Sequence, residues 1–176
     1  MTVASDKIVE AGAHRYRALG IDPGLAETGY AVIGTFAKGG ELCNWGTLKT
    51  SVRLSVPCRL QTIYNGIDEI VKNWKPTILV VEDVYVLDKF PKAAIHLGEV
   101  RGVIYLAAQD NNIEVMKIRV TELKKSLTGN GRATKDHVNR AVKRVLGVKE
   151  EIKPDHASDA AALALIGISR KGYYVW

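Results

Sequence analysis

Three carboxylates stand at positions where a globular protein seldom places a charge. Asp22 ends an apolar segment, Glu82 ends the continuous apolar run at 78–81, and Asp159 lies near the start of an alanine-rich segment. Burying a charge costs free energy unless the charge is paired or bound to a cation. Within its own apolar segment, none of the three has a Lys or Arg beside it. We therefore expect the three carboxylates to converge in one compact acidic site.

His156 adds an imidazole to this set. It lies three residues before Asp159, and on a helix an i, i+3 pair shares one face, so both side chains can point at one spot. Carboxylate oxygens with one imidazole suit Mg²⁺ or Mn²⁺. Two such ions about 4 Å apart form a common arrangement for displacement at phosphorus, in which they activate water and neutralise the leaving oxygen. The four residues together point to metal-dependent phosphodiester hydrolysis.

Each of the four residues also has a structural explanation. Asp22, before a Pro-Gly pair, could start a turn, and Glu82 could be a buried salt-bridge partner. His156 could be a polar residue at a helix terminus, and Asp159 could interact with the helix dipole. The four residues occur together in a pattern, with one acid after each of two strands and two polar residues at the start of one helix. This pattern favours the catalytic interpretation over four separate structural explanations.

Two neighbouring acids compete for a place in this site. Side chains alternate along a strand, so Asp83 faces away if Glu82 faces the site. Asp155 lies four residues before Asp159 and could share its helix face. We rank it second to His156.

The elements that must position these residues follow from the hydrophobic pattern. Segments of strand character at 15–22, 29–36 and 41–48, joined by short turns, predict an antiparallel meander. A helix over 60–74, ended by Pro76, and a buried strand over 78–81 are expected next, followed by a helix over 93–109 and a strand over 113–118. Three helices complete the chain: one over 121–127, one that begins after a cap at Thr134, and one over 157–169. The order βββαβαβααα predicts the α/β class with a mixed sheet.

Composition limits the remaining possibilities. The 176 residues suit one domain that buries a core without disulfide or metal staples. With 47% hydrophobic and 25% charged residues, the composition excludes disorder, collagen and coiled coil. An apolar run long enough for a membrane span and a signal-peptide pattern are both lacking. We expect residues 1–15 to form a flexible N-terminal arm or to be a non-native remnant, and residues 16–176 to form a single domain.

Net charge indicates the kind of binding partner, and cysteine content indicates the redox state of the compartment. The net charge of +6 hints at a polyanionic partner. Cys43 and Cys58 lie far apart without a partner motif, which excludes a disulfide framework or a zinc knuckle and fits a reducing compartment.

Five segments, in their order and spacing, resemble the RuvC-type Holliday-junction resolvases. They are LGIDPGLAETGYAVI, VVEDVYV, GEVRG, GNGRATK and PDHASDAAALAL, and the similarity runs from about Ala18 to Ile168. The resemblance implies an RNase H-like fold, with a mixed five-stranded sheet of three antiparallel strands followed by parallel strands, flanked by helices. It also implies a homodimer that nicks two opposed strands of a four-way DNA junction symmetrically, in recombination and repair.

The resemblance places the family's four acidic-site positions on Asp22, Glu82, His156 and Asp159. It implies two divalent ions per subunit, Mg²⁺ with Mn²⁺ as a substitute. Many family members carry Asp at the position of His156 and others carry His. His156 could therefore be a metal ligand, a general base or both.

The resemblance also implies contacts to DNA. Tyr85, three positions after Glu82, matches an aromatic residue near the junction centre, where a ring could stack on bases, and Phe90 is the alternative. Lys135 matches the lysine of the GxGxAxK motif, beside helix amides that could hold a phosphate. Lys124 matches another basic family position, whereas Lys125 and Arg132 are expected at DNA only because of their charge. The full set of expected DNA contacts is Tyr85, Lys89, Arg101, Lys124, Lys125, Arg132 and Lys135.

The remaining expectations concern partners and location. Gly98 and Gly102 would let their helix pack closely against its twin in a dimer. The resemblance allows a branch-migration motor as a further partner, and no membrane partner is expected. The expected location is the cytoplasm, at the nucleoid, if the host is a bacterium, with an organellar matrix or stroma as the alternative. His14, His96 and His137 have no acidic partner in motif spacing and receive no role.

Three other functions remain open at this stage. A junction-binding module without catalysis could use the same fold, although the intact site residues argue against it. An actin-like ATPase shares a similar opening motif but needs a second duplicated domain, for which 176 residues leave no room. Another RNase H-like nuclease could act on RNA or RNA–DNA hybrid, which substrate competition would reveal.

Overall fold

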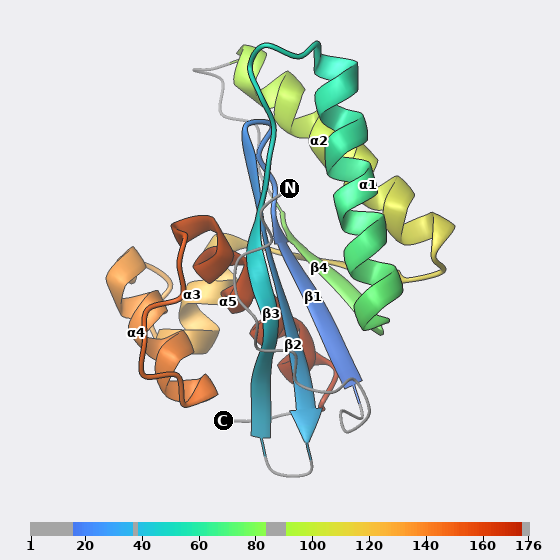
Figure 1. Ribbon diagram of the computed structural model, residues 1–176. Helices are drawn as coiled ribbons and strands as arrows, with labels where there is room; N and C mark the ends of the chain where they lie inside the picture. Colours follow the sequence, from blue (N-terminus) through green and yellow to red (C-terminus); the bar gives the residue numbers. More distant parts are fainter. Residues whose placement is uncertain (1–15, 37–38, 84–90, 174–176) are drawn as a thin grey trace.

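A five-stranded sheet with helices on both faces forms the centre of the molecule (Figure 1). The structure, a computed structural model, describes residues 16–36, 39–83 and 91–173. Its strands are β1 (Tyr16–Asp22), β2 (Glu27–Phe36), β3 (Gly39–Lys49), β4 (Ile78–Glu82) and β5 (Glu114–Ile118). Its helices are α1 (Val56–Trp74), α2 (Pro91–Asp110), α3 (Val120–Thr128), α4 (Lys135–Leu146) and α5 (Asp155–Arg170).

The sheet is mixed, with the strand order β3-β2-β1-β4-β5. The pairs β1–β2 and β2–β3 are antiparallel, whereas β1–β4 and β4–β5 are parallel. The expected order of strands and helices and the mixed sheet are thus confirmed. The strand β1 lies at the centre, and its parallel neighbour β4 brings a second carboxyl end to the same edge.

The helix α1 begins four residues earlier than the hydrophobic pattern predicts. Its first turn starts at Val56 with Pro57 in the first helical positions, where a proline is tolerated because its missing N–H has no partner there. The first turn buries no residue, so the apolar periodicity that marks the rest of the helix does not extend to it. The expected start at Leu60 was therefore one turn too late.

The two faces of the sheet are covered by different helices. Ala18 of β1 and Val80 of β4 pack in one core with residues of α3, α4 and α5. Leu19 and Leu79, their neighbours in sequence, pack in a second core with α1 and α2. Because side chains alternate along a strand, the last residues of β1 and β4 fall on the α5 face.

The helix α5 lies unusually close to the sheet. Its 11 buried residues are mostly alanine, leucine and isoleucine, and the small alanine side chains allow a close approach. A Cβ atom added to Gly20 would lie 1.9 Å from the carbonyl oxygen of Ala160. The alanine-rich sequence of α5 and the glycine of β1 therefore set the position of this helix together.

The start of α4 supplies a test of local stability. The Thr134 side chain accepts a hydrogen bond from the backbone N–H of His137 at 3.4 Å. Thr134→Ala removes this cap and is expected to lower the free energy of unfolding by about 1 kcal/mol, measured by urea denaturation. The matched control is Ser55→Ala, because the Ser55 side chain makes no capping hydrogen bond to α1. Equal losses in the two variants would contradict the assigned cap.

Two further observations concern the chain as a whole. Among the residues that the structure describes, we found no helix with the length and apolar character that crossing a membrane requires. Cys43 is buried and Cys58 is exposed, and no disulfide joins these two described cysteines. The expectation for the arm at residues 1–15 lies outside the described residues.

Candidate functional site

The four predicted site residues come from three elements that meet at one edge of the sheet. Asp22 is the last residue of β1 and Glu82 the last of β4. The parallel register pairs Ile21 with Val81, so the two carboxylates extend from adjacent strands at the same edge. His156 and Asp159 lie at the start of α5. We call these four residues the acidic site.

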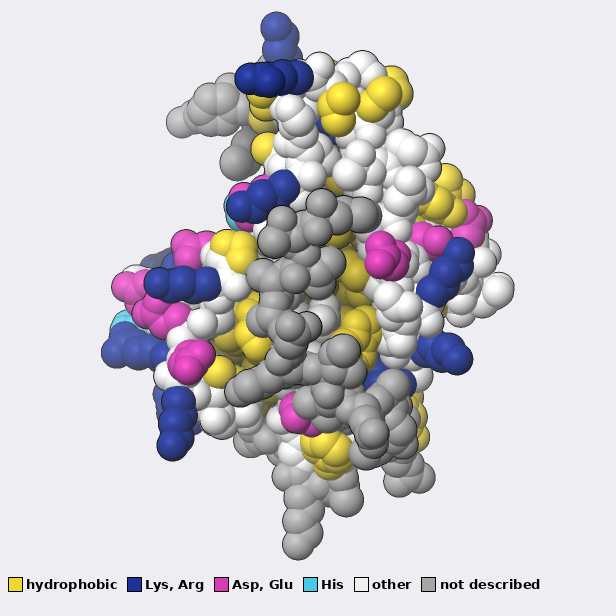
Figure 2. Space-filling view, viewed as in Figure 1, with side chains coloured by type: hydrophobic (Ala, Val, Ile, Leu, Met, Phe, Trp, Pro, Cys, Tyr) yellow, Lys and Arg dark blue, Asp and Glu magenta, His cyan; other side chains and the backbone are white. Residues whose placement is uncertain are grey.

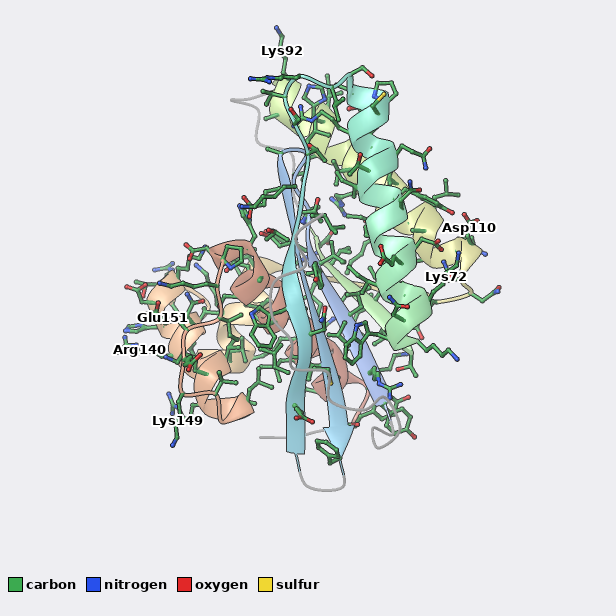
Figure 3. The ribbon with its side chains drawn as sticks, viewed as in Figure 1. Lys72, Lys92, Asp110, Arg140, Lys149 and Glu151 are labelled. Atoms are coloured by element: carbon green, nitrogen blue, oxygen red, sulfur yellow. The ribbon has the colours of Figure 1, made fainter. Side chains whose placement is uncertain are left out.

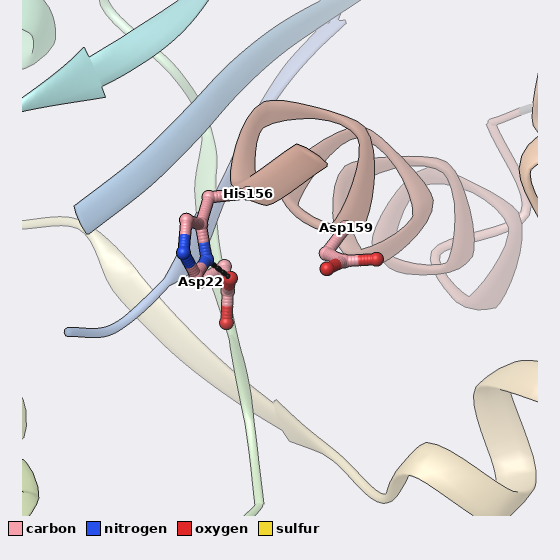
Figure 4. A group of neighbouring side chains, drawn as sticks. All are labelled: Asp22, His156 and Asp159. Atoms are coloured by element: carbon pink, nitrogen blue, oxygen red, sulfur yellow. Dashed lines mark hydrogen bonds and ion pairs between the residues drawn. The ribbon is translucent and has the colours of Figure 1, made fainter. Parts of the chain in front are cut away.

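Three of the four residues offer ligand atoms at metal-binding spacing. One such atom each from Asp22, His156 and Asp159 lies within 4.8 Å of the others, and they form the one group of this kind among the described residues (Figure 4). Glu82 stands outside this group, although it ends β4 beside the end of β1, where Asp22 lies. Two carboxylates and one imidazole are a donor set that suits Mg²⁺ or Mn²⁺. The residues present therefore fit a divalent ion.

A short hydrogen bond joins Asp22 to His156. The imidazole Nδ1 lies 2.6 Å from Oδ2 of Asp22 (dashed line in Figure 4). If Asp22 is ionised, its carboxylate can only accept, and the ring then carries a proton on Nδ1 in this contact. In the neutral ring, Nε2 is then left with a lone pair that can bind a metal or accept a proton.

Burial and mutual repulsion make the acidic site electrostatically costly. Burial raises the pKa of Asp22 above its ordinary value, against the hydrogen bond from His156, which lowers it, and the charge of Asp159 raises it further. Burial also raises the pKa of Glu82, as do the charges of Asp22 and Asp159. A divalent cation would relieve this repulsion, because it favours the charged form of each carboxylate.

Neither of the two competing acids belongs to the group of three residues with closely spaced ligand atoms. Asp83 has its Oδ1 3.7 Å from Nη2 of Arg101, which belongs to the helix α2 on the other face of the sheet. This position agrees with the alternation argument. Asp155 lies outside the group of three and has Oδ2 3.4 Å from Nζ of Lys135, which agrees with its ranking below His156.

Apart from Arg101, the expected DNA contacts fall into three classes. Lys135 lies at the acidic site itself, with Nζ 2.9 Å from Oδ2 of Asp159. Lys124 and Lys125 lie on α3, and Arg132 lies exposed in the segment before α4. In Figure 2, Lys and Arg side chains gather with acidic ones along the flank formed by α3 and α4. Tyr85, Lys89 and the alternative Phe90 lie outside the described residues.

Arg101 differs from the other expected DNA contacts. Its side chain is only 16% exposed, and the guanidinium donates to the Tyr105 hydroxyl from Nε at 3.1 Å and from Nη2 at 2.8 Å. With Asp83 as its further neighbour, Arg101 links α2 to the end of β4. The charge of Arg101 also lowers the pKa of Glu82, against the larger effect of burial.

Two features of the site were not predicted from the sequence. One is the ion pair between Lys135 and Asp159, which joins α4 to α5. The other is the close approach of Gly29 to α5, since an added Cβ would lie 2.1 Å from the carbonyl oxygen of His156. The glycine between Thr28 and Tyr30 was visible as a motif, but the motif does not reveal which backbone lies against it.

Comparison with protein families gives a match over most of the chain. The family model described as crossover junction endodeoxyribonuclease RuvC matches residues 18–167. A protein of this name from Fusobacterium nucleatum is 36% identical over 156 residues, which cover 89% of this chain and 82% of the relative. A protein of the same name from Caldicellulosiruptor saccharolyticus is 38% identical over 154 residues, covering 86% of this chain and 92% of the relative.

Solved structures of RuvC proteins also match this chain. The RuvC structure of Thermus thermophilus matches with a TM-score of 0.80 and 28% identity, over 89% of this chain and 97% of the other. The T. thermophilus RuvC in complex with a Holliday junction substrate matches with a TM-score of 0.83 and 28% identity, over 90% and 98% of the two chains. The fold similarity therefore extends over nearly the whole length of both proteins.

Proposed function

The chain belongs to the RuvC family of crossover junction endodeoxyribonucleases, and we propose that it cuts four-way DNA junctions at the acidic site formed by β1, β4 and α5. Its motifs and its RNase H-like sheet are those expected of this family, and its class of activity is that of a nuclease acting on DNA. The observation that carries the assignment of the site is the group of ligand atoms from Asp22, His156 and Asp159 within 4.8 Å of one another.

The acidic site would hold the divalent ions on which we propose that cleavage depends. Asp22 and Asp159 would bind through carboxylate oxygens, and Glu82, whose carboxylate interacts with both charges, would complete a place for a second ion. When bound, Mg²⁺ or Mn²⁺ promotes ionisation of water and neutralises the charge that develops on the phosphate and leaving oxygen. Two ions per subunit, with Mg²⁺ as the usual ion, remain part of the proposal.

Two roles are open to His156 at this site, that of a metal ligand and that of a general base. Its Nδ1 is held by Asp22, which fixes the ring and leaves Nε2 as the free acceptor in the neutral tautomer. Nε2 can then act as a ligand, or it can take the proton from the attacking water as a general base. Asp22 stabilises the positive ring that would form in the second case.

The helices α3 and α4 would hold the DNA beside the acidic site. Lys124, Lys125 and Arg132 are proposed to contact phosphates, which makes the affinity for the junction fall with salt concentration. In Figure 3, Arg140 and Lys149 also project from this flank, away from the sheet. Tyr85 is proposed to stack on bases near the junction centre, and Lys89 to contact the backbone.

A homodimer would present two such sites to opposed strands. The helix α2 carries an exposed face with Ile95 at 61% and Leu106 at 54% exposure. Between them, Gly98 and Gly102 have open space where a Cβ would lie. Two such faces could approach closely, because the small residues let the helix backbones come together while the apolar side chains are buried. We propose that this face forms the dimer interface around a two-fold axis.

Leu106→Glu is expected to convert the dimer into a monomer, because it places a charge in the proposed apolar interface. Sedimentation velocity would measure the change in mass. The matched control is Val52→Glu, at a residue 81% exposed in the loop before α1, which should leave the dimer unchanged. A dimer that persists in the Leu106→Glu variant would contradict this interface.

The proposed function is tested by mapping the cuts on a fixed four-way junction, strand by strand, with and without Mg²⁺. The expected result is paired symmetric nicks in two opposed strands, only with the metal, and no competition by RNA–DNA hybrid. A single nick, cutting of flaps, or preference for the hybrid would contradict junction resolution. Since the relatives described above are bacterial proteins, we propose that the chain acts at a bacterial nucleoid, with a branch-migration motor as a further partner.

A further inference from the structure

A lysine side chain of the protein itself contacts one of the proposed metal-binding carboxylates. Lys135, the first residue of α4, donates from Nζ to Oδ2 of Asp159 at 2.9 Å and lies 3.4 Å from Oδ2 of Asp155. Asp159 is one of the three residues that offer ligand atoms within 4.8 Å. One of the oxygens that a divalent ion would use is thus engaged by an ammonium group.

The ammonium group keeps its charge in this position. The hydrogen bond to Asp159 raises the pKa of Lys135 above its ordinary value, and the charges of Asp159 and Asp155 act in the same direction. The charge of Lys135 also lowers the pKa of Asp22, against the larger effect of burial, which raises it. Lys135 therefore offsets part of the repulsion in the acidic site.

The side chain of Lys135 can leave this position without disturbing the core. It is 47% exposed and extends from the exposed first turn of α4, where the residues before and after it are also exposed. A lysine side chain is long and flexible, so its ammonium can swing outward while its backbone stays in the helix. A divalent ion near Asp159 would both compete for the oxygen and repel the ammonium.

We propose that Lys135 is a built-in counter-ion of the acidic site, which competes with divalent metal for Asp159 and is released toward solvent and a DNA phosphate when the metal binds. This inference rests on the proposed metal site. It gives the lysine two alternating partners, a carboxylate before the metal binds and a phosphate afterwards. Metal and DNA would then promote each other's binding, because coupling between two ligands is reciprocal.

The first test is titration of the DNA-free protein with Mn²⁺, with free Mn²⁺ followed by electron paramagnetic resonance. Lys135→Met is expected to tighten Mn²⁺ binding by about two- to fivefold, which corresponds to the upper part of the range for loss of an exposed ion pair. The matched control is Lys143→Met, which removes the same charge two turns further along α4 and should leave the affinity close to that of the wild type. An unchanged or weakened affinity in Lys135→Met would overturn the inference.

The second test uses the wild-type protein and does not depend on any variant. An amine-acetylating reagent should modify Lys135 several-fold faster in saturating Mn²⁺ than in EDTA, with Lys143 as the internal reference in the same mass spectra. Equal or slower modification of Lys135 in Mn²⁺ would overturn the inference. If the wild-type protein and both variants bind no Mn²⁺, the proposed metal site itself fails. If all three bind it with one affinity, only the role of Lys135 fails.

Discussion

Asp22→Asn is expected to slow cleavage of a four-way junction by roughly 10³-fold or more, the scale seen when a central catalytic group is removed, while junction binding is largely retained. The reason is that the variant keeps the shape of Asp22 but removes its negative charge from the group of ligand atoms that lie within 4.8 Å of one another. Single-turnover cleavage in Mg²⁺ measures the rate, and a gel-shift titration in EDTA measures binding. Glu82→Gln is expected to behave in the same way.

Two controls separate this effect from unfolding and from general loss of charge. Because burial raises the pKa of Asp22, its charged form costs folding free energy at pH values above that raised pKa. Stability is thus lost as the pH rises from the unfolded to the folded pKa. Asn carries no such cost, so Asp22→Asn should be at least as stable as the wild type at pH 7.5 without metal, by thermal denaturation. Asp155→Asn, in the same region, should retain cleavage. If both Asp22→Asn and Glu82→Gln cut DNA in the presence of metal as fast as the wild type, the assignment of the acidic site as the catalytic site is wrong.

Gly29→Ala is expected to damage both the stability of the fold and the geometry of the acidic site. The added Cβ would lie 2.1 Å from the backbone oxygen of His156 and 2.7 Å from its Cβ, and a backbone oxygen cannot rotate away. The first turn of α5 must move, at a cost of about 3 kcal/mol or more. We expect a matching loss in urea denaturation and loss of cleavage at temperatures where the variant is still folded.

The matched control for this prediction is Gly39→Ala. Gly39 begins β3, has no atom within 4 Å of an added Cβ, and does not need a positive φ. Its substitution should leave both the free energy of unfolding and the cleavage rate near those of the wild type. A Gly29→Ala protein as stable and active as the wild type would show that α5 does not lie against β2 as described.

Much of the architecture could be predicted because it depends on local patterns. Alternation and apolar runs located every strand of the described chain, while helices were indicated by 3.6-residue periodicity at 60–74, by the cap at Thr134 and by the alanine-rich run at 157–169. The convergence of Asp22 with Glu82 follows from two carboxyl ends of parallel strands, and that of His156 with Asp159 from one helix face. These short-range rules account for each of the two pairs. The meeting of the two pairs depends on the packing of α5 against β1 and β4, and that part of the prediction came from the cost of burying unpaired charges and from the family resemblance.

The contacts between elements could not be predicted in the same way. The pairing of Lys135 with Asp159 depends on the packing of α4 against α5, and the sequence separation of 24 residues carries no periodic signal. Arg101 was expected at DNA and lies in the GEVRG segment that carries part of the family resemblance. That segment does not reveal that the Arg101 guanidinium donates to the Tyr105 hydroxyl and lies near Asp83.

The central claim is that the acidic site is the metal centre of the nuclease, and diffraction from crystals grown in Mn²⁺ tests it most directly. Anomalous scattering at the manganese edge should show an ion about 2–2.5 Å from carboxylate oxygens of Asp22 and Asp159, as hard cations bind oxygen ligands. The ammonium of Lys135 should then have left Asp159. Manganese bound elsewhere, with Lys135 still paired to Asp159 and no ion at the acidic site in saturating Mn²⁺, would contradict the claim.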